Sequence, residues 1–336
     1  MLIRNSIKIT FSKFLLLLIV LLITIINRLA SAQPNVHPII LKSITLPYKT
    51  MPLSTVYIHN EVWITAYGRQ SILIFDCRTG ILIKELKDPF LAVYMASDEQ
   101  SGKVFLSSFI NKGIEVIDEL TFKEQIIVTN DNFNRLTISD RVLYACAFSS
   151  PKLYKIDIST KSVENMFNLP QVGFYSVVTK DKIYIASALD ATEDKPDQDD
   201  SRIIVVQKNN GIVSKIINIP GKDVQCLAWD NDKYIYTASN TNGSLVRINI
   251  INDNIDREYS IPINRAFDIL IDTMKAVAYI STQGINTLYI VSLNDKEILN
   301  RYTIGEGIMS SQIKDNKTTT VWINSFKDSY IVAINN

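Results

Sequence analysis

Hydrophobic and polar positions recur along most of the chain with a period of about 42 residues. One marker consists of an aromatic residue, any residue, and then two small or short polar residues. It begins at Trp63, Phe105, Tyr144, Tyr184, Tyr236, Tyr279 and Trp322, with intervals of 42, 39, 40, 52, 43 and 43 residues. Seven similar units of this length predict a repeat architecture.

A second marker follows each copy of the first, as an apolar run that ends in a polar residue. These polar residues are Asp76, Asp118, Asp157, Gln207, Asn249, Ser292 and Asn335. The apolar runs are short, rich in Ile, Val and Tyr, and separated by Asp, Asn and Gly, which is typical of strands joined by turns. Four such strands make one propeller blade. We therefore predict an all-β fold, a seven-bladed β-propeller of four-stranded blades over residues 40–336.

The end of each unit indicates how the ring closes. Thirteen residues after the second marker stand Pro89, Asp131, Pro170, Pro220, Pro262 and Gly305. Proline is tolerated at the end of an outer strand, where no ladder hydrogen bond is lost. The seventh unit stops at Asn336 without room for an outer strand, whereas residues 40–47 resemble the outer strands at 212–220 and 255–262. We expect this N-terminal segment to complete the last blade.

The units resemble the YVTN-type repeat, in which an aromatic-containing strand precedes a hydrophobic strand that ends in Asp and a Thr-Gly turn. The first unit matches at Asp76, Thr79 and Gly80, and the second and third match in part at Asp118 and Asp157. The resemblance covers nearly all of residues 40–336 and implies an exported scaffold more than an activity. The docking tryptophan of quinone-dependent dehydrogenase propellers is absent after Gly80, so no cofactor is predicted.

The first 32 residues have the features of a secretory signal peptide. Basic residues precede a 13-residue apolar run, 14–26, and Ala30-Ser31-Ala32 forms an A-x-A cleavage site. The run is short for a bilayer span, which needs about 20 residues. We predict cleavage near Ala32, a linker at 33–39, and a periplasmic or extracellular protein. An uncleaved membrane anchor is the alternative.

The overall charge of the chain is close to neutral. The chain has 35 basic and 34 acidic residues, which gives no electrostatic reason to expect nucleic acid or an anionic membrane surface as a partner. The mature chain is expected to be monomeric and to have no transmembrane span. Its three cysteines, Cys77, Cys146 and Cys226, are too few and too widely spaced for a disulfide framework or a zinc site. They are expected to be buried core residues, the alternative being one reactive or intermolecular thiol.

Catalytic chemistry has little support in the sequence. The two histidines are His37, ahead of the closing strand, and His59, in a turn of the first unit. Carboxylates near the channel remain possible metal ligands, since related hydrolases and lactonases hold calcium there. Asp268 and Asn134 are candidates, although calcium takes six to eight oxygen ligands.

An acidic insertion lengthens the fourth unit. Residues 190–200 contain five aspartates and one glutamate, which cannot form a packed core. We interpret this segment as a solvated hairpin tip, the alternatives being a contact for a basic partner or a cation site. The metal-ligand candidates there are Asp197, Asp199 and Asp200.

Aromatic residues gather at one position of the repeat, four residues after the first marker. They are Tyr67, Phe109, Phe148 and Phe326, which belong to units contiguous in ring order, and basic residues stand nearby at Arg69, Lys112 and Lys327. Either the rings pack between blades, or they form a protein-docking surface. These seven residues are the predicted partner-binding set.

Three functions therefore remain open. The first is an exported binding or protein-interaction propeller with its partner, a protein or a small molecule, on the face of these loops. The second is an exported metal-dependent hydrolase or lactonase with its site at the channel mouth. The third is a structural component of the cell envelope.

Overall fold

The computed structural model confirms an all-β propeller of four-stranded antiparallel blades. It describes residues 39–335 apart from 189–200, 222–223, 225, 240–243, 262, 264, 284, 286, 296, 304–312, 316–319 and 326–329. The predicted signal peptide, 1–32, and all of the predicted linker except Ile39 lie outside the described residues. Within the described part, no helix is both long and apolar enough to cross a membrane.

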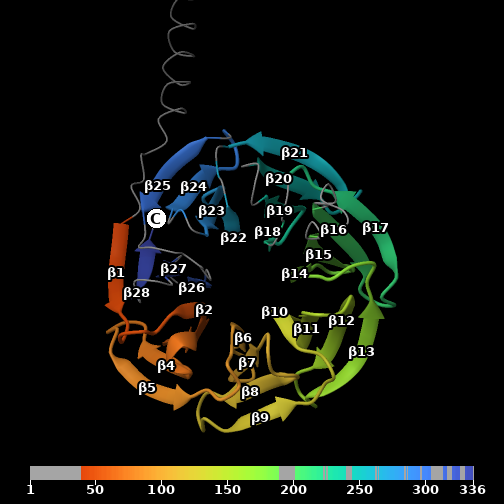
Figure 1. The fold of residues 1–336 in the computed structure, drawn as a ribbon. Coiled ribbons are helices and arrows are strands. Elements are labelled where there is room, and N and C mark those ends of the chain that lie inside the picture. Colours follow the sequence, from red (N-terminus) through yellow and green to blue (C-terminus); the bar gives the residue numbers. More distant parts are fainter. Residues whose placement is uncertain are drawn as a thin grey trace, which may run out of the picture. The chain divides into compact units, whose positions relative to one another are not determined.

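The strands occupy four positions from the ring axis outward (Figure 1). The inner strands are β2 (Pro52–Ile58), β6 (Tyr94–Asp98), β10 (Phe133–Ser139), β14 (Tyr175–Val178), β18 (Ala228–Trp229), β22 (Ala266–Asp272) and β26 (Ile313–Asp315). The second strands are β3 (Glu61–Ala66), β7 (Lys103–Ser107), β11 (Val142–Ala147), β15 (Lys182–Ala188), β19 (Tyr234–Ala238), β23 (Val277–Thr282) and β27 (Thr320–Ser325).

The third and outer strands complete the sheets. The third strands are β4 (Ser71–Asp76), β8 (Ile114–Asp118), β12 (Lys152–Asp157), β16 (Ser201–Gln207), β20 (Ser244–Asn249), β24 (Thr287–Ser292) and β28 (Tyr330–Asn335). The outer strands are β5 (Leu82–Lys87), β9 (Glu124–Ile127), β13 (Ser162–Asn168), β17 (Val213–Asn218), β21 (Asn254–Ser260), β25 (Ile298–Thr303) and β1 (Ile39–Thr45). A short 3-10 helix, η1 (Tyr67–Arg69), follows β3.

Six blades are each built from four consecutive strands. Blade 1 is β2–β5, blade 2 is β6–β9, blade 3 is β10–β13, blade 4 is β14–β17, blade 5 is β18–β21 and blade 6 is β22–β25. The seventh four-stranded sheet of the described residues has the order β1-β28-β27-β26. We call it the closing sheet. Its outer strand, β1, corresponds to the segment 40–47 that the sequence predicts to pair there (Figure 1).

The hydrophobic core consists of layers between neighbouring blades. Side chains alternate between the two faces of a strand, so each blade presents an apolar surface to both neighbours. In blade 2, Ile117 packs in a cluster with Ile74 of blade 1, while the adjacent Val116 packs in a cluster with Phe133 of blade 3. All four side chains are buried. Inter-blade packing therefore holds the sheets of blades 1, 2 and 3 against one another.

The closing sheet contacts both of its neighbours in the ring. Ile323 of β27 packs in a cluster with side chains of blade 6, and Ile44 of β1 packs in a cluster with side chains of blade 1. Asn324 donates a hydrogen bond from Nδ2 to the Pro52 carbonyl of β2, at 3.1 Å. The closing sheet consequently lies between blade 6 and blade 1.

The polar residue at the end of the third strand forms the turn that follows. In blade 1, Asp76 Oδ1 accepts hydrogen bonds from the Thr79 hydroxyl at 2.7 Å and the Thr79 N–H at 2.5 Å. These bonds, led by that of the hydroxyl, hold the pKa of Asp76 below its usual value. Asp118 and Thr121 repeat the arrangement in blade 2. The second sequence marker is thus a turn-forming residue.

Blade 2 buries an acidic side chain against blade 1. Glu115 of β8 is 4% exposed, and Asp88, in the loop after β5, is 2% exposed. Burial, together with the charges of Asp88 and Glu124, raises the pKa of Glu115 to about 8. Burial also raises the pKa of Asp88. Burial therefore disfavours the charged form of both carboxyl groups in the folded protein.

This pair makes stability fall as pH rises. Between the ordinary pKa of glutamate, near 4.5, and the raised value near 8, the folded state holds a proton that the unfolded state has released. At about 1.4 kcal/mol for each pKa unit, we expect a loss of a few kcal/mol across this window. In urea unfolding at pH 5, 6.5 and 8, Glu115→Gln should make the free energy of unfolding less dependent on pH. The exposed control Glu99→Gln should leave this pH dependence unchanged. An unchanged slope in Glu115→Gln would contradict this assignment.

Candidate functional site

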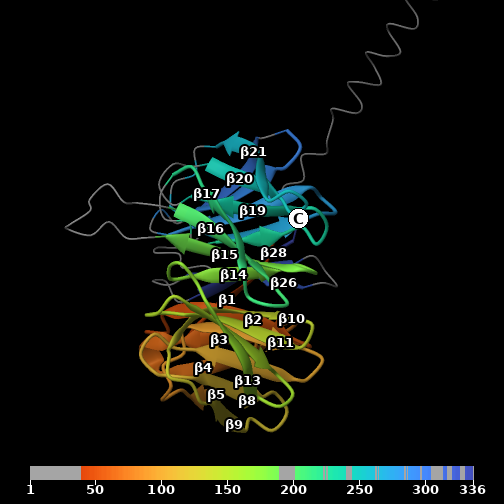
Figure 2. The same cartoon turned by 90° about the vertical axis from the view of Figure 1, so that its right-hand side faces the viewer.

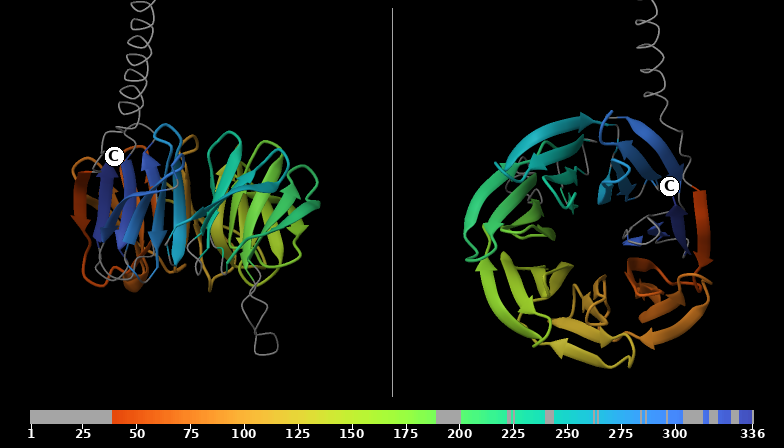
Figure 3. Two further views of the ribbon diagram at one scale, coloured as in Figure 1. Left: turned by 90° about the horizontal axis from the view of Figure 1, so that it is seen from above. Right: turned by 180° about the vertical axis from the view of Figure 1, so that it is seen from behind.

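The inner strands begin at the end of the ring where the second strands finish. Antiparallel register sets Tyr94 opposite Ser107 and Phe133 opposite Ala147. The strands run along the ring axis, as the side views show (Figures 2 and 3). Tyr67, Phe109 and Phe148, which stand just after the second strands of blades 1, 2 and 3, therefore lie at the end where the inner strands begin.

A pocket of about 160 Å³ lies among the inner strands of five blades. We call it the axial pocket. Its lining comes from β2, β6, β10, β14 and β22, and consists of Ser54, Thr55, Val56, Tyr94, Met95, Arg135, Leu136, Tyr175, Asp268, Ile269 and Leu270. Most lining residues stand in the first half of their strands, so the pocket lies toward the end with the aromatic loops.

An ion pair joins opposite sides of this pocket. Arg135 Nη1 of blade 3 lies 2.8 Å from Asp268 Oδ1 of blade 6, and the two side chains are only 12% and 9% exposed. Arg135 Nη2 contacts the Phe267 carbonyl at 3.5 Å. Burial, the largest single effect, would lower the pKa of Arg135, but the interactions with Asp268, Tyr94 and Tyr175 together raise it. The guanidinium therefore stays charged at every physiological pH.

Three aromatic rings surround the guanidinium. Its central carbon lies 5.1 Å from the ring centroid of Tyr94, 5.2 Å from that of Tyr175 and 5.0 Å from that of Phe267. Such cation–π contacts stabilise a cation that has lost most of its water. Burial, with the nearby charge of Asp268, raises the pKa of Tyr175 to about 12. The phenol of Tyr175 thus remains protonated at neutral pH.

The predicted channel carboxylate is therefore already engaged. Asp268 lines the axial pocket, as its position in the repeat predicts, but its charge is balanced by Arg135. Asn134 does not reach the pocket lining, since it is buried and donates to the Gly173 carbonyl at 2.9 Å. In the part of the chain that the structure describes, no three His, Cys, Asp or Glu side chains form a group that could hold a metal ion.

Two of the predicted aromatic residues form a stack at the edge of the axial pocket. The rings of Phe109 and Phe148 lie 4.5 Å apart at 24°, and Phe109 contacts Tyr94 edge-on at 5.8 Å. Phe109 is half-buried, whereas Phe148 is 40% exposed. We call these two residues the rim pair. The contact with Tyr94 makes the rim pair continuous with the axial pocket.

The other predicted partner-binding residues are more scattered. Tyr67 is half-buried at the start of η1, and Arg69 is paired with Glu85 at 3.0 Å. Lys112 is exposed. Phe326 and Lys327, and the metal-ligand candidates Asp197, Asp199 and Asp200, lie outside the described residues.

His59 and two of the three cysteines occupy the places that the sequence indicates, whereas Cys77 is less buried than expected. His59 is in the turn between β2 and β3, and its Nδ1 lies 2.7 Å from Glu119 Oε2. Cys146 and Cys226 are buried and Cys77 is half-buried, all three as free thiols. Burial raises the pKa of Cys146 to about 12, so this thiol does not ionise at neutral pH.

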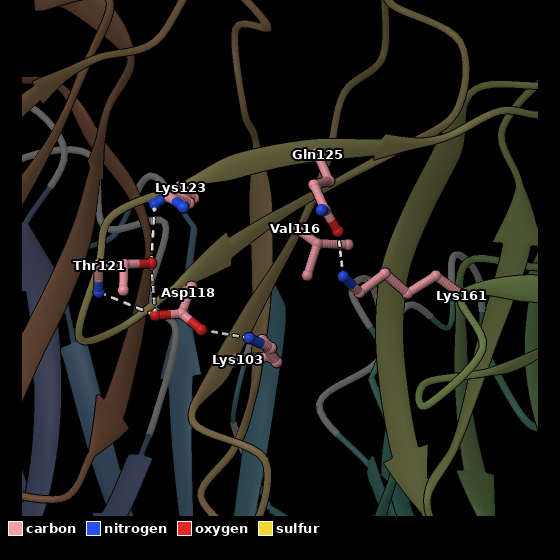
Figure 4. Close-up of a pocket in the computed structure, with 7 residues that line it drawn as sticks. All are labelled: Lys103, Val116, Asp118, Thr121, Lys123, Gln125 and Lys161. Atoms are coloured by element: carbon pink, nitrogen blue, oxygen red, sulfur yellow. Dashed lines mark hydrogen bonds and ion pairs between the residues drawn. The ribbon is translucent and has the colours of Figure 1, made fainter.

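A second pocket, of about 290 Å³, lies between blade 2 and blade 3 at the opposite end of the strands. We call it the lysine groove. Lys103, Val116, Asp118, Thr121, Lys123, Gln125 and Lys161 line it (Figure 4). Lys103 is paired with Asp118, and Lys161 of blade 3 donates to the side-chain oxygen of Gln125.

Sequence reasoning did not find Arg135, Tyr94, Tyr175 or the lysine groove. Arg135 carried one signal, since it is a cation within the apolar inner strand of its unit, between Phe133 and Leu136. The lysines carried none, because single lysines on turns and strand ends are common surface residues.

The comparison with solved structures supports the fold. No family model matches the chain, and no curated protein matches it. Among solved structures, it is similar to a chain of hydrazine synthase from Kuenenia stuttgartiensis, with a TM-score of 0.73 and 11% sequence identity. The similarity covers 87% of this chain and 97% of that one. At this identity, the likeness shows a shared β-propeller fold alone.

The axial ion pair gives a prediction about stability. Asp268→Asn should leave the Arg135 guanidinium buried without a counter-charge, at a cost of about 3 to 5 kcal/mol. The control Glu85→Gln breaks the more exposed pair with Arg69 and should cost less than about 1 kcal/mol. Urea unfolding at neutral pH measures both. Equal losses in the two variants would show that the axial pair is not buried as described.

Proposed function

We propose that the protein is an exported, seven-bladed propeller of the YVTN repeat type, closed by β1, that binds a partner at the end of the ring carrying the rim pair. Export is supported by the basic, apolar and A-x-A segments of residues 1–32. Seven blades are supported by the order of the closing sheet and by its contacts with blades 1 and 6. The repeat type is supported by the Asp76–Thr79 turn.

The exposed ring of Phe148 is the observation that carries the binding function. A phenylalanine that is 40% exposed and stacked on a second ring presents flat apolar area that is already ordered, so binding costs little side-chain entropy. Aromatic anchors of this kind dominate the energy of many protein interfaces. The adjoining axial pocket adds a buried cation and two phenols, Tyr94 and Tyr175, beside this apolar anchor.

The proposed partner is a protein that contacts the rim pair. A metal-dependent hydrolysis gains no specific support, because Asp268 is paired with Arg135. Lys112, exposed on the loop of Phe109, would favour an acidic side chain at the edge of the partner.

Site-specific photo-crosslinking in the native host tests the proposal. A benzophenone side chain at position 148 should give one discrete adduct, whereas the same group at position 120 should give none. Leu120 is the matched control, since it is apolar, 86% exposed and located in the β8–β9 turn at the opposite end of the strands.

The rim pair should also govern the yield of this adduct. Phe109→Ala removes the ring that supports position 148 and should lower the yield about fivefold, as expected for a supporting residue of an interface anchor. Equal adducts at both positions, or none at position 148, would contradict a partner site at this end.

A further inference from the structure

The sheet of blade 2 separates the lysine groove from the buried acidic side chains of Glu115 and Asp88. Residues that alternate along a strand face opposite sides of the sheet. Lys103 and Asp118 are direct partners in the β7–β8 ladder, and Gln125 is the partner of Val116 in the β8–β9 ladder. All four belong to the face that packs on blade 3, because Val116 lies in the cluster shared with that blade.

Two other acidic residues of blade 2, Glu115 and Glu124, lie on the opposite face of the sheet. Glu115 and Glu124 each alternate with a residue of the first face, and both interact with Asp88, from the loop after blade 1. Because the sheet separates the two sets, these acidic side chains do not neutralise the lysine groove. The third lysine, Lys161, reaches the groove from the β12–β13 turn of blade 3.

The charges in the groove do not balance. Asp118 compensates Lys103, and the hydrogen bonds from Lys103 and Thr121 hold the pKa of Asp118 far below its usual range, so it stays ionised. Lys161 is held by Gln125, whose amide oxygen carries no charge. Lys123 has no side-chain partner within the described residues. The ammonium groups of Lys123 and Lys161 are therefore left without a counter-charge in the groove. The buried side chain of Val116 supplies an apolar part of the lining.

The turn itself does not explain these lysines. Blade 1 forms the same Asp-Thr turn with Asp76 and Thr79, but places Glu61 where blade 2 has Lys103, opposite the aspartate. Blade 3 has Val142 at that position, opposite Asp157. Lys208, in the third-to-outer turn of blade 4, also reaches the preceding blade, but there it meets a carboxylate, Asp140, at 2.8 Å. Blades 1 and 3 thus lack the lysine opposite the turn aspartate, and Lys208 of blade 4 is already paired.

We propose that the lysine groove binds a small anion with at least two negative charges, of the phosphate or sulfate ester class. Lys123 and Lys161 would contact the anion directly, and Asp118 would hold Lys103 at the edge of the groove (Figure 4). The groove, at about 290 Å³, has room for a sugar-sized group resting on Val116 in addition to the charged oxygens. The site is independent of the partner surface at the rim pair, which lies at the opposite end of the strands.

Isothermal titration of the purified protein with inorganic pyrophosphate tests the proposal. Saturable binding is expected at low ionic strength, weakened by added sodium chloride because the site is largely electrostatic. Lys161→Gln and Lys123→Gln should each weaken it about fivefold, the usual size for one partly exposed charge contact. The control Lys208→Gln removes a lysine of similar location that is already paired, and should leave the affinity unchanged.

A second titrant, glucose 6-phosphate, distinguishes a phosphate ester from a free polyphosphate as the ligand of the groove. Tighter binding of the sugar phosphate would identify an ester whose sugar rests on Val116, and tighter binding of pyrophosphate would identify a free polyphosphate. Both results support the site. Absence of saturable binding by either titrant, or an equal loss in Lys161→Gln and Lys208→Gln, would overturn it.

Discussion

Apolar packing between neighbouring blades is the interaction on which the rest of the structure depends. Each sheet has two apolar faces, so none can be stable until it is covered on both sides. Ile74 with Ile117, and Val116 with Phe133, illustrate the layers that result. A row of such sheets leaves its two end faces exposed unless the ends meet. The contacts of Ile323 with blade 6 and of Ile44 with blade 1 cover those faces through the closing sheet.

The candidate sites are consequences of this packing. Because every blade has the same orientation, the inner strands all begin at one end, where Arg135 and Asp268 meet from opposite blades. The charge of Arg135 is tolerated there because Tyr94, Tyr175 and Phe267 replace its lost water. The turns between third and outer strands all lie at the other end, where one inter-blade gap collects the lysines of the groove. One repeated unit thus creates two chemically different ends.

The sequence predicts the features that local chemistry determines. The positions of Asp76 and Asp118 predict where the third strands end, because their carboxylates form the turns that follow. The similarity of residues 40–47 to the outer strands predicts β1. The position of Asp268 near the ring axis follows from its place in the repeat. The identity of its partner cannot be predicted in this way, because Arg135 is 133 residues away in the sequence and the two side chains meet only when the ring is formed. The meeting of Lys161 with Gln125 is equally non-local.

Complementation of a truncated chain tests ring closure most directly. A protein starting at Tyr48 would lack β1, and its urea midpoint can be measured with and without a synthetic peptide of residues 38–47, PIILKSITLP. We predict a lower midpoint for the truncated chain, because β28 loses its neighbouring strand, and recovery when the peptide binds. A truncated chain with the midpoint of the full protein and no affinity for the peptide would contradict closure by β1.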